Sequence, residues 1–429
     1  MNAWHRAAWA AFFALGAAAA PLRAQPADMA ALQSRATQQV PAVLETMKQL
    51  VAIESGSRDL EGLAEAVRLV ASRLQAAGMA VQVIPTQAPA FNPQLKGAPL
   101  GPMVLATKAG TGSHKVLLIA HLDTVYARGM AARQPFRIDG DRAYGLGISD
   151  DKGGVALILH VVELLEQLGL HGYAQLAVLI NADEEIGSPG SAPTLIRLGS
   201  EYDAVLSFEG GGVDQDMLRL ATSAIATAEL KVTGRAAHAG AFPEGGRNAL
   251  YELAHQVLRS RHLGDPARGL KINWTVARAG EVRNVIPASA SAFADIRAID
   301  SADLDLIEAA LRESIQERLI PDTVVELEFR RGRPAFAANA ASRVLALHAQ
   351  AVFKEMGLTL GIRDRATGGG TDAAYAGLRP KGAVLESFGP RGFGAHSNDR
   401  EYVVISSIAP RLALAMRLVL DIGSGAVRW

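Results

Sequence analysis

Polar residues with metal-binding chemistry stand at the ends of apolar runs in this sequence. The run from 116 to 120 ends in His121 and Asp123, which alternate along an extended chain and therefore point to the same side. For one short His-x-Asp match, a capped strand end is the simpler interpretation. The other interpretation is a metal ligand and the carboxylate that orients it, because α/β sheets present ligands at the carboxyl ends of their strands.

Three further segments place acids in the same setting. Asp150 and Asp151 follow a glycine-rich turn and precede an amphipathic helix, which an aspartate can also cap. Glu184 and Glu185 follow the apolar run LAVLI, and Glu209 follows VLSF. Adjacent glutamates at the end of a buried strand cost free energy unless a cation holds them. The pattern therefore predicts a cation at this edge of a sheet.

A second imidazole, His396, lies in a glycine-rich loop near the carboxyl end of the chain. Oxygen and imidazole ligands without thiolate suit zinc and permit cobalt or manganese. The chain has no cysteine, so it has neither thiolate ligands nor disulfides. Because the carboxylates outnumber what one zinc needs, we expect two metal ions that share a bridging carboxylate. In such a site His121 is a ligand, and Asp123 accepts its other N–H.

The elements that must position these residues alternate between strand and helix. The pattern predicts helical spacing from 40 to 77, strands at 81–85, 116–120, 175–181, 203–208 and 383–388, and helices at 152–168, 191–198, 340–356 and 406–422. An irregular loop is expected from 85 to 102. This order favours an α/β sheet that is covered by helices on both faces.

Residues 223–331 have an order of their own. The pattern predicts strands at 226–234, 271–279, 285–299 and 323–331, and helices at 246–261 and 302–319. The order β-α-β-β-α-β is typical of a ferredoxin-like α+β sandwich, which can bury its own core. We therefore predict a larger domain in two parts, residues 25–222 and 332–429, with this small domain inserted into it.

Composition and the amino terminus narrow the class of protein further. The 429 residues exceed one typical domain, and Lys+Arg and Asp+Glu both number 43, a balance that indicates no nucleic-acid or membrane-surface partner. Residues 1–24 combine a basic start, an apolar stretch from 7 to 20 and no acid, with Ala24 as a cleavage point. This pattern predicts a secretory signal peptide rather than a membrane anchor. We expect a periplasmic or secreted protein without membrane contact after cleavage.

A series of motifs extends the pattern from about residue 40 to the end of the chain: HLDTV, GISDDKGG, NADEEIGS, SFEG, GRAAHAG, RNVIPA, RGRPAF, TGGGTDAAYA and FGAHSNDREYV. Together they resemble the motifs of the glutamate carboxypeptidases, the carboxypeptidase G group. These belong to the co-catalytic zinc peptidases, with the aminoacylases and the succinyl-diaminopimelate desuccinylases. The resemblance implies an exopeptidase that releases a carboxyl-terminal amino acid, with glutamate expected, from a small peptide or an N-acyl conjugate such as a folate-type compound.

The resemblance also implies a ligand set for two zinc ions per subunit. Asp150 would bridge the ions, His121 and Glu209 would complete one zinc, and Glu185 and His396 would complete the other. The inserted domain would act as a lid and as the dimerisation domain of a homodimer.

Further roles follow from the same resemblance. The Asp150–Asp151 peptide would be cis, and Asp150 rather than Asp151 would be the ligand, because the matching aspartate stands two residues before the lysine. Glu184 would be the general base, which accepts a proton from water and passes it to the leaving amine. His238 would donate to the tetrahedral oxyanion in the partner's site, although spacing alone fits a surface loop histidine.

An exopeptidase of this kind must hold a free carboxylate, for which arginine has the apt geometry. By resemblance this residue is Arg333, with Asn284 and the backbone of Gly368, Gly369 and Gly370 as helpers. The glycine-rich segment equally fits a turn in which Asp372 caps the next helix.

The sequence departs from the group's pattern at a position that bears on which terminal side chain of the substrate is preferred. Met217 stands where the group tends to place a basic residue, so a preference for glutamate would need Arg219, which fits a solvated residue beside the domain junction equally well. Two other hypotheses are a deacylase or dipeptidase of the same fold, and a non-catalytic dimeric binding protein with a relict site. The complete ligand set and Glu184 disfavour the second.

Overall fold

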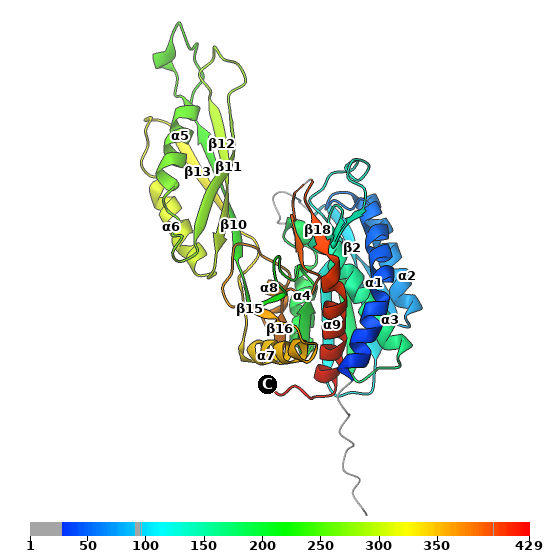
Figure 1. The fold of residues 1–429 in the computed structure, drawn as a ribbon. Coiled ribbons are helices and arrows are strands. Elements are labelled where there is room, and N and C mark those ends of the chain that lie inside the picture. The colour runs from blue at the N-terminus through cyan, green and yellow to red at the C-terminus, as the bar shows by residue number, and fades with distance from the viewer. Residues whose placement is uncertain (1–27, 91–94, 96, 398) are drawn as a thin grey trace, which may run out of the picture.

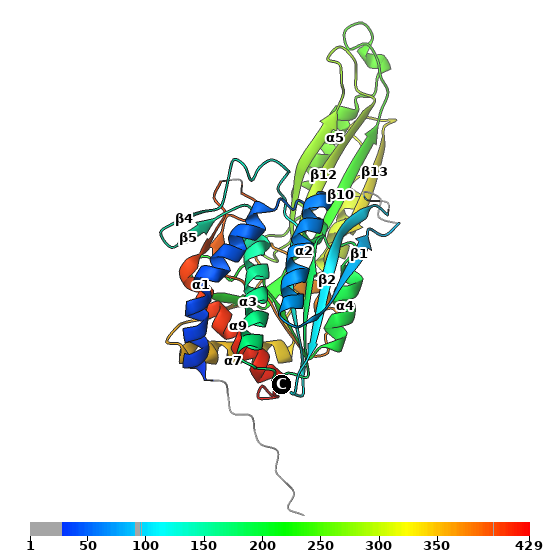
Figure 2. The same cartoon turned by 90° about the vertical axis from the view of Figure 1, so that its right-hand side faces the viewer.

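The structure is a computed structural model that describes residues 28–90, 95, 97–397 and 399–429. A compact domain of helices around a sheet bears an elongated inserted domain, residues 223–331, that projects from it (Figures 1 and 2). The predicted signal peptide, residues 1–24, lies outside the described residues. Among the helices that the structure describes, none is both long and apolar enough to cross a bilayer.

A six-stranded mixed sheet forms the centre of the larger domain. Its strands, in spatial order, are β1 (Ala80–Gln87), β2 (Pro99–Ala109), β6 (Gln175–Asn181), β3 (Lys115–His121), β7 (Ala204–Ser207) and β16 (Ala383–Leu385). The last four strands run parallel to one another. At one edge of the sheet, β2 runs antiparallel to β6, and β1 runs antiparallel to β2. The carboxyl ends of the parallel strands therefore meet at one edge of the sheet, where ligands bind in open α/β sheets.

Helices cover both faces of this sheet, as the sequence predicts. One face packs against α1 (Met29–Ala52), α2 (Leu60–Ala76), α3 (Gly153–Gln167) and α9 (Ile408–Gly423), the other against α4 (Ala192–Glu201) and α8 (Ala373–Ala376), and α7 (Ala340–Glu355) packs beside β16. In β3, Val116 and Leu118 join the core of the first face, and Leu117 and Ile119 join that of the second. Strands that are buried on both faces are continuously apolar, which is why these runs are visible in the sequence.

The inserted domain is a four-stranded antiparallel sheet with two helices on one face. Its strands, in spatial order, are β11 (Lys271–Ala279), β12 (Ser289–Ala298), β10 (Ala224–Thr233) and β13 (Val324–Arg331), and its helices are α5 (Ala249–Ser260) and α6 (Asp303–Ser314). This order confirms the ferredoxin-like sandwich. Alanine side chains on the buried face, such as Ala226, Ala228 and Ala294, let the helices pack close to the sheet.

The chain crosses between the two domains twice. It leaves the larger domain through β9 (Ala221–Thr222) into β10, and it returns from β13 into β14 (Phe336–Ala337). β9 and β14 pair with each other, so both crossings lie side by side. β10 starts at this junction, and the loop that follows it forms part of the far tip of the inserted domain (Figure 1).

Two predicted elements differ in kind from the structure, and two others are shorter than predicted: the helix expected at 302–319 ends at Ser314, and the strand expected at 383–388 ends at Leu385. The segment 40–77, predicted as helical, contains two helices, α1 and α2, which residues 53–59 separate. In this break, the hydroxyls of Ser55 and Ser57 donate hydrogen bonds to the loop after β3. The predicted loop 85–102 includes the start of β2, which the sequence does not suggest because of its glycine and prolines. Pro102 fits there because it lies where the register between β1 and β2 shifts, before pairing with β6 begins at Val104.

A second, smaller sheet joins segments that are far apart in the sequence. Its strands are β17 (Gly392–Phe393), β18 (Tyr402–Val404), β5 (Arg142–Tyr144) and β4 (Arg137–Asp139). This pairing sets the hairpin between β17 and β18, which contains His396, beside the loop that leads from β5 to Asp150.

Candidate active site

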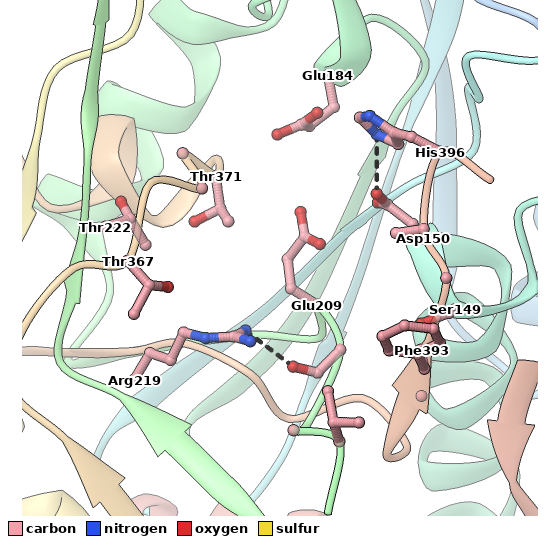
Figure 3. Close-up of a pocket in the computed structure, with 18 of the residues that line it drawn as sticks. Ser149, Asp150, Glu184, Glu209, Arg219, Thr222, Thr367, Thr371, Phe393 and His396 are labelled. Atoms are coloured by element: carbon pink, nitrogen blue, oxygen red, sulfur yellow. Dashed lines mark hydrogen bonds and ion pairs between the residues drawn. The ribbon is translucent and has the colours of Figure 1, made fainter. Parts of the chain in front are cut away.

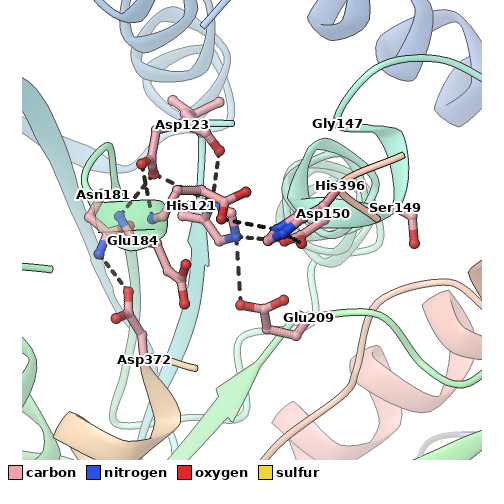
Figure 4. A network of polar contacts seen from close by, with 12 residues as sticks. His121, Asp123, Gly147, Ser149, Asp150, Asn181, Glu184, Glu209, Asp372 and His396 are labelled. Atoms are coloured by element: carbon pink, nitrogen blue, oxygen red, sulfur yellow. Dashed lines mark hydrogen bonds and ion pairs between the residues drawn. The ribbon is translucent and has the colours of Figure 1, made fainter. Parts of the chain in front are cut away.

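The predicted metal ligands meet at the carboxyl edge of the parallel strands (Figure 4). The Asp150–Asp151 peptide, which follows a left-handed Gly147, is cis as expected. The ligand atoms form two triads in each of which all atoms lie within 4.8 Å of one another: an inner triad of His121, Asp150 and Glu209, and an outer triad of Asp150, Glu185 and His396.

Asp150 belongs to both triads and turns one oxygen to each. Its Oδ1 lies 3.1 Å from His121 Nε2, and its Oδ2 lies 3.2 Å from His396 Nε2. Glu209 Oε1 is 3.6 Å from the first imidazole, and Glu185 Oε2 is 3.1 Å from the second. A carboxylate with one oxygen in each group has the geometry that a bridging ligand requires.

The donor set fits a pair of metal cations. Burial raises the pKa of Glu185, and burial together with the neighbouring Asp150 raises the pKa of Glu209. Glu185 Oε1 is buried and has no hydrogen-bond partner among the described residues. Crowded, unpaired carboxylates cost free energy, and bound cations remove that cost. Carboxylate oxygen and imidazole nitrogen are ligands that zinc accepts.

Asp123 lies fully buried behind the candidate ligands and contacts four residues around them. His121 Nδ1 donates to the main-chain oxygen of Asp123 at 3.0 Å and lies 3.4 Å from its carboxylate. The same carboxylate accepts the backbone N–H groups of Glu184 (2.9 Å) and Glu185 (3.0 Å) and the hydroxyl of Ser57 (2.7 Å). Asp123 therefore sets the turn that follows β6 as well as the orientation of the imidazole.

Glu184 presents its carboxylate to the cavity, on the opposite side from Glu209 (Figure 3). Burial raises the pKa of Glu184 to about 8, although the charge of Arg333 acts against this rise. Arg333 donates from Nη1 to Glu184 Oε1 and is itself 3% exposed.

Sequence reasoning missed Glu401, which holds the loop that presents Asp150. Its buried carboxylate accepts the backbone N–H groups of Gly147 (2.8 Å), Ser149 (2.8 Å) and Asp150 (3.2 Å) and the hydroxyl of Tyr126 (2.6 Å). Burial raises the pKa of Glu401 to about 7. Its only signal in the sequence is an acid near His396, which does not reveal contacts with residues some 250 positions earlier.

A cavity of about 440 Å³ opens beside the triads, and its lining includes two arginines, Arg219 and Arg297. Figure 3 shows Arg219. Arg219 donates from Nη1 to the main-chain oxygen of Gly210 (3.0 Å) and to Ser387 Oγ (2.7 Å). Arg297, which sequence reasoning did not single out, forms a two-bond ion pair with Asp295. Gly369 and Gly370 also line the cavity, as do ligands of both triads, whereas Arg333 does not.

His238 and Asn284 lie at the far tip of the inserted domain and do not line this cavity. Both are exposed, and the N–H of Ala239 donates to the main-chain oxygen of Asn284 at 3.0 Å. His238 Nδ1 accepts the backbone N–H groups of Gly240 (3.1 Å) and Ala241 (3.0 Å). An imidazole that accepts at Nδ1 is left with Nε2 as its donor.

Comparisons with known proteins agree with this fold. The model of peptidase family M20/M25/M40 matches residues 117–421. Carboxypeptidase G2 from Pseudomonas sp. (strain RS-16) is 44% identical over 421 residues, which cover 98% of this chain and 99% of that protein.

Two solved structures share the fold. The di-peptidase Dug1p from Saccharomyces cerevisiae has a TM-score of 0.75 at 15% identity and covers 92% of this chain and 98% of its own. The M20 metallo-carboxypeptidase Sso-CP2 from Sulfolobus solfataricus has a TM-score of 0.69 at 16% identity and covers 88% of this chain and 98% of its own. At these identities the two structures show the fold alone.

A helix-covered sheet with histidine–carboxylate triads at its carboxyl edge, interrupted by a ferredoxin-like domain, is an architecture that can hold metal ions beside a cavity. The chain belongs to peptidase family M20/M25/M40 and is a metallocarboxypeptidase.

Proposed function

We propose that the protein is a dizinc carboxypeptidase that hydrolyses the amide bond of a carboxyl-terminal glutamate in peptides or N-acyl conjugates, folate-type compounds included. The observation that supports this proposal most strongly is Asp150, which turns one oxygen to each triad. The 44% identity to Carboxypeptidase G2 over nearly the whole chain supports the class of reaction.

In this proposal each triad holds one metal ion. His121 and Glu209 complete the inner site, Glu185 and His396 complete the outer site, and Asp150 is shared. The ligand types suit zinc and permit cobalt or manganese. When bound, such ions would polarise the scissile carbonyl and activate water for attack on it.

Glu184 acts as the general base. Its carboxylate accepts the proton of the attacking water and then gives it to the nitrogen of the leaving amine. The backbone contacts of Asp123 keep Glu184 and Glu185 in fixed but different directions, so that one glutamate binds metal while the other moves the proton.

A glutamate substrate brings two carboxylates that need cations. Arg219 suits the side-chain carboxylate, because it lines the cavity and its side chain donates to the neutral oxygens of Gly210 and Ser387. The backbone of Gly369 and Gly370 lines the same wall. Binding of the terminal carboxylate by Arg333 stays a prediction, and in this conformation Arg333 lies outside the cavity.

We further propose a homodimer through the inserted domain, residues 223–331, in which His238 and Asn284 complete the partner's site. Their distance from the cavity of their own chain and the free donor of His238 support this arrangement. The larger domain would then be built from residues 25–222 and 332–429. Residues 1–24 would direct export to the periplasm or the medium.

The experiment that tests this function is amino-acid release from N-acyl substrates that differ only in their terminal residue: glutamate, glutamine, aspartate and leucine. We expect the glutamate substrate to have the highest kcat/KM.

Chelation of the metal ions should abolish the activity, and addition of zinc should restore it. The variant Arg219→Met should reduce the preference for glutamate over glutamine about tenfold, the worth of one charge-assisted hydrogen bond. A wild-type preference for leucine would refute the glutamate assignment, and a purified protein with less than stoichiometric metal would favour a relict site.

A further inference from the structure

The cavity beside the triads has an apolar part to which the proposed function gives no role. Its lining includes Val213 and Phe393, which are 43% and 48% exposed. The two lie in neighbouring segments, because the N–H of Gly392 donates to the main-chain oxygen of Gly212 at 2.9 Å. Large apolar side chains that stay open to water inside a ligand cavity mark a place where an apolar part of a ligand is buried.

Phe393 lies across the candidate metal site from a cationic part of the cavity. Figure 3 shows Phe393 and Arg219 on opposite sides of Glu209, a member of the inner triad. In the proposed function the terminal amino acid of the substrate binds at Arg219. The scissile amide joins that amino acid to the acyl group, so the two parts extend from the reacting carbon in opposite directions. The acyl group is therefore expected on the side of Phe393.

The small sheet of β17, β18, β5 and β4 holds the ring of Phe393 in place. Phe393 in β17 pairs with Tyr402 in β18, and Tyr402 pairs with Tyr144 in β5. The ring centroids are 6.1 Å apart in the first pair and 5.4 Å apart in the second. The guanidinium carbon of Arg142 lies over the Tyr402 ring, 4.5 Å from its centroid. Because cross-strand aromatic pairs stabilise one another, the sheet itself sets the position of the Phe393 ring.

We infer that Phe393 is a specificity-determining residue that stacks on a flat aromatic acyl group of the substrate. The inference rests on the proposed function, because it takes the terminal residue to bind at Arg219 and the amide to lie at the triads. Two aromatic rings gain from offset-stacked or edge-to-face contact in addition to the burial of their surfaces. A saturated ring of the same size gains only the burial. Phe393 therefore selects aromatic over aliphatic acyl groups when the terminal glutamate is the same.

The test compares three substrates that share the glutamate and differ in the acyl group: N-benzoyl-, N-cyclohexylcarbonyl- and N-acetyl-glutamate. The readout is the ratio of their kcat/KM values, because the amount of active enzyme cancels from it. A partial loss of zinc or of folded protein therefore leaves the ratio unchanged. In wild type we expect kcat/KM to fall in the order benzoyl, cyclohexylcarbonyl, acetyl. Phe393→Ala should lower the benzoyl-to-acetyl ratio about tenfold.

Two further variants separate the effect of the ring from that of an apolar side chain. Phe393→Leu removes the ring but stays apolar, so it should lower the benzoyl-to-cyclohexylcarbonyl ratio about threefold. Its cyclohexylcarbonyl-to-acetyl ratio should stay within about twofold of wild type, since burial against leucine is similar. Phe393→Tyr keeps the ring and should retain both ratios. A wild type that prefers the cyclohexylcarbonyl substrate to the benzoyl substrate would contradict stacking.

The matched control is Leu378→Ala. Leu378 has the same exposed fraction as Phe393, 48%, and lies outside the lining of the cavity. Its ratios should equal those of wild type. An unchanged benzoyl-to-acetyl ratio in Phe393→Ala, or an equal fall in Leu378→Ala, would overturn the inference. Failure of the proposed function would look different, because wild type would then prefer another terminal residue at a fixed benzoyl group.

Discussion

The two triads of the metal site differ in how firmly the protein holds them. In the inner triad, the His121 side chain is 1% exposed, ends a strand in the middle of the sheet and donates to Asp123. In the outer triad, the His396 side chain is 55% exposed and lies in the hairpin between β17 and β18, at a φ of 64°. The inner site is therefore built into the core of the fold, and the outer site depends on a surface hairpin.

This difference indicates an order of metal binding. A ligand set that is already in place binds metal without the cost of ordering side chains, and a set on an exposed loop must be ordered by the metal. We expect the inner ion to bind more tightly and the outer ion to be lost first on dilution or chelation. Asp150 couples the two sites because it belongs to both.

The largest expected effects follow removal of an imidazole ligand. His396→Ala should keep about one zinc per chain and His121→Ala less than one, because His121→Ala removes a ligand of the site that we expect to bind more tightly. Both variants should lower kcat by about 10³ or more, since the proposed reaction uses both ions. Zinc per chain after gel filtration checks this, and two zinc ions in His396→Ala would remove His396 from the ligand set.

Glu184→Gln should change the zinc content little but lower kcat strongly. This change removes the base without removing a ligand, so zinc should stay at two per chain while kcat falls about 10²- to 10⁴-fold. The measurement is kcat beside metal content. Loss of zinc from this variant would show that Glu184 and Glu185 exchange their roles.

Residues behind the ligands give an intermediate test of the inner–outer comparison. Asp123→Asn should weaken the inner site more than the outer site, because the Asp123 carboxylate lies 3.4 Å from His121 Nδ1 and reaches the outer triad only through the backbone N–H of Glu185. Glu401→Gln should weaken both sites, because Glu401 holds the loop of the shared Asp150. Losses of about 10- to 100-fold in zinc affinity are expected, as for other residues that orient ligands. Stepwise titration of the metal-free proteins with zinc distinguishes the sites. Equal weakening of both sites by Asp123→Asn would contradict the division.

The smallest expected signal comes from the exposed tip. A mixture of His238→Ala and Glu184→Gln protomers should regain about a quarter of wild-type activity, because half of the dimers are mixed and each has one intact composite site. Activity after verified subunit exchange is the measurement. No recovery would mean that each tip serves its own chain.

The sequence predicts the strand ends that bear the ligands well, because a buried strand is a continuous apolar run and a polar residue at its end is conspicuous. It predicts β6 and β11 to the residue. It does not predict Glu401 or Ser57, which reach the site across long sequence separations and look like ordinary surface residues. The contact between Arg333 and Glu184 likewise depends on tertiary packing, since the motif RGRPAF does not indicate which carboxylate the guanidinium contacts.

The paired crossings between the domains make the inserted domain a lever arm. β10 is a strand of 10 residues that starts at the pivot, so its outer end lies about 34 Å away. A rotation of about 10° at β9 and β14 would therefore move the tip by about 6 Å, more than the length of a hydrogen bond. In a dimer that uses His238 across subunits, catalysis would then require the angle between the two domains to be held within a few degrees at the β9–β14 pair. Thr222 and Phe336 pair with each other there, so they would influence the rate from outside the site.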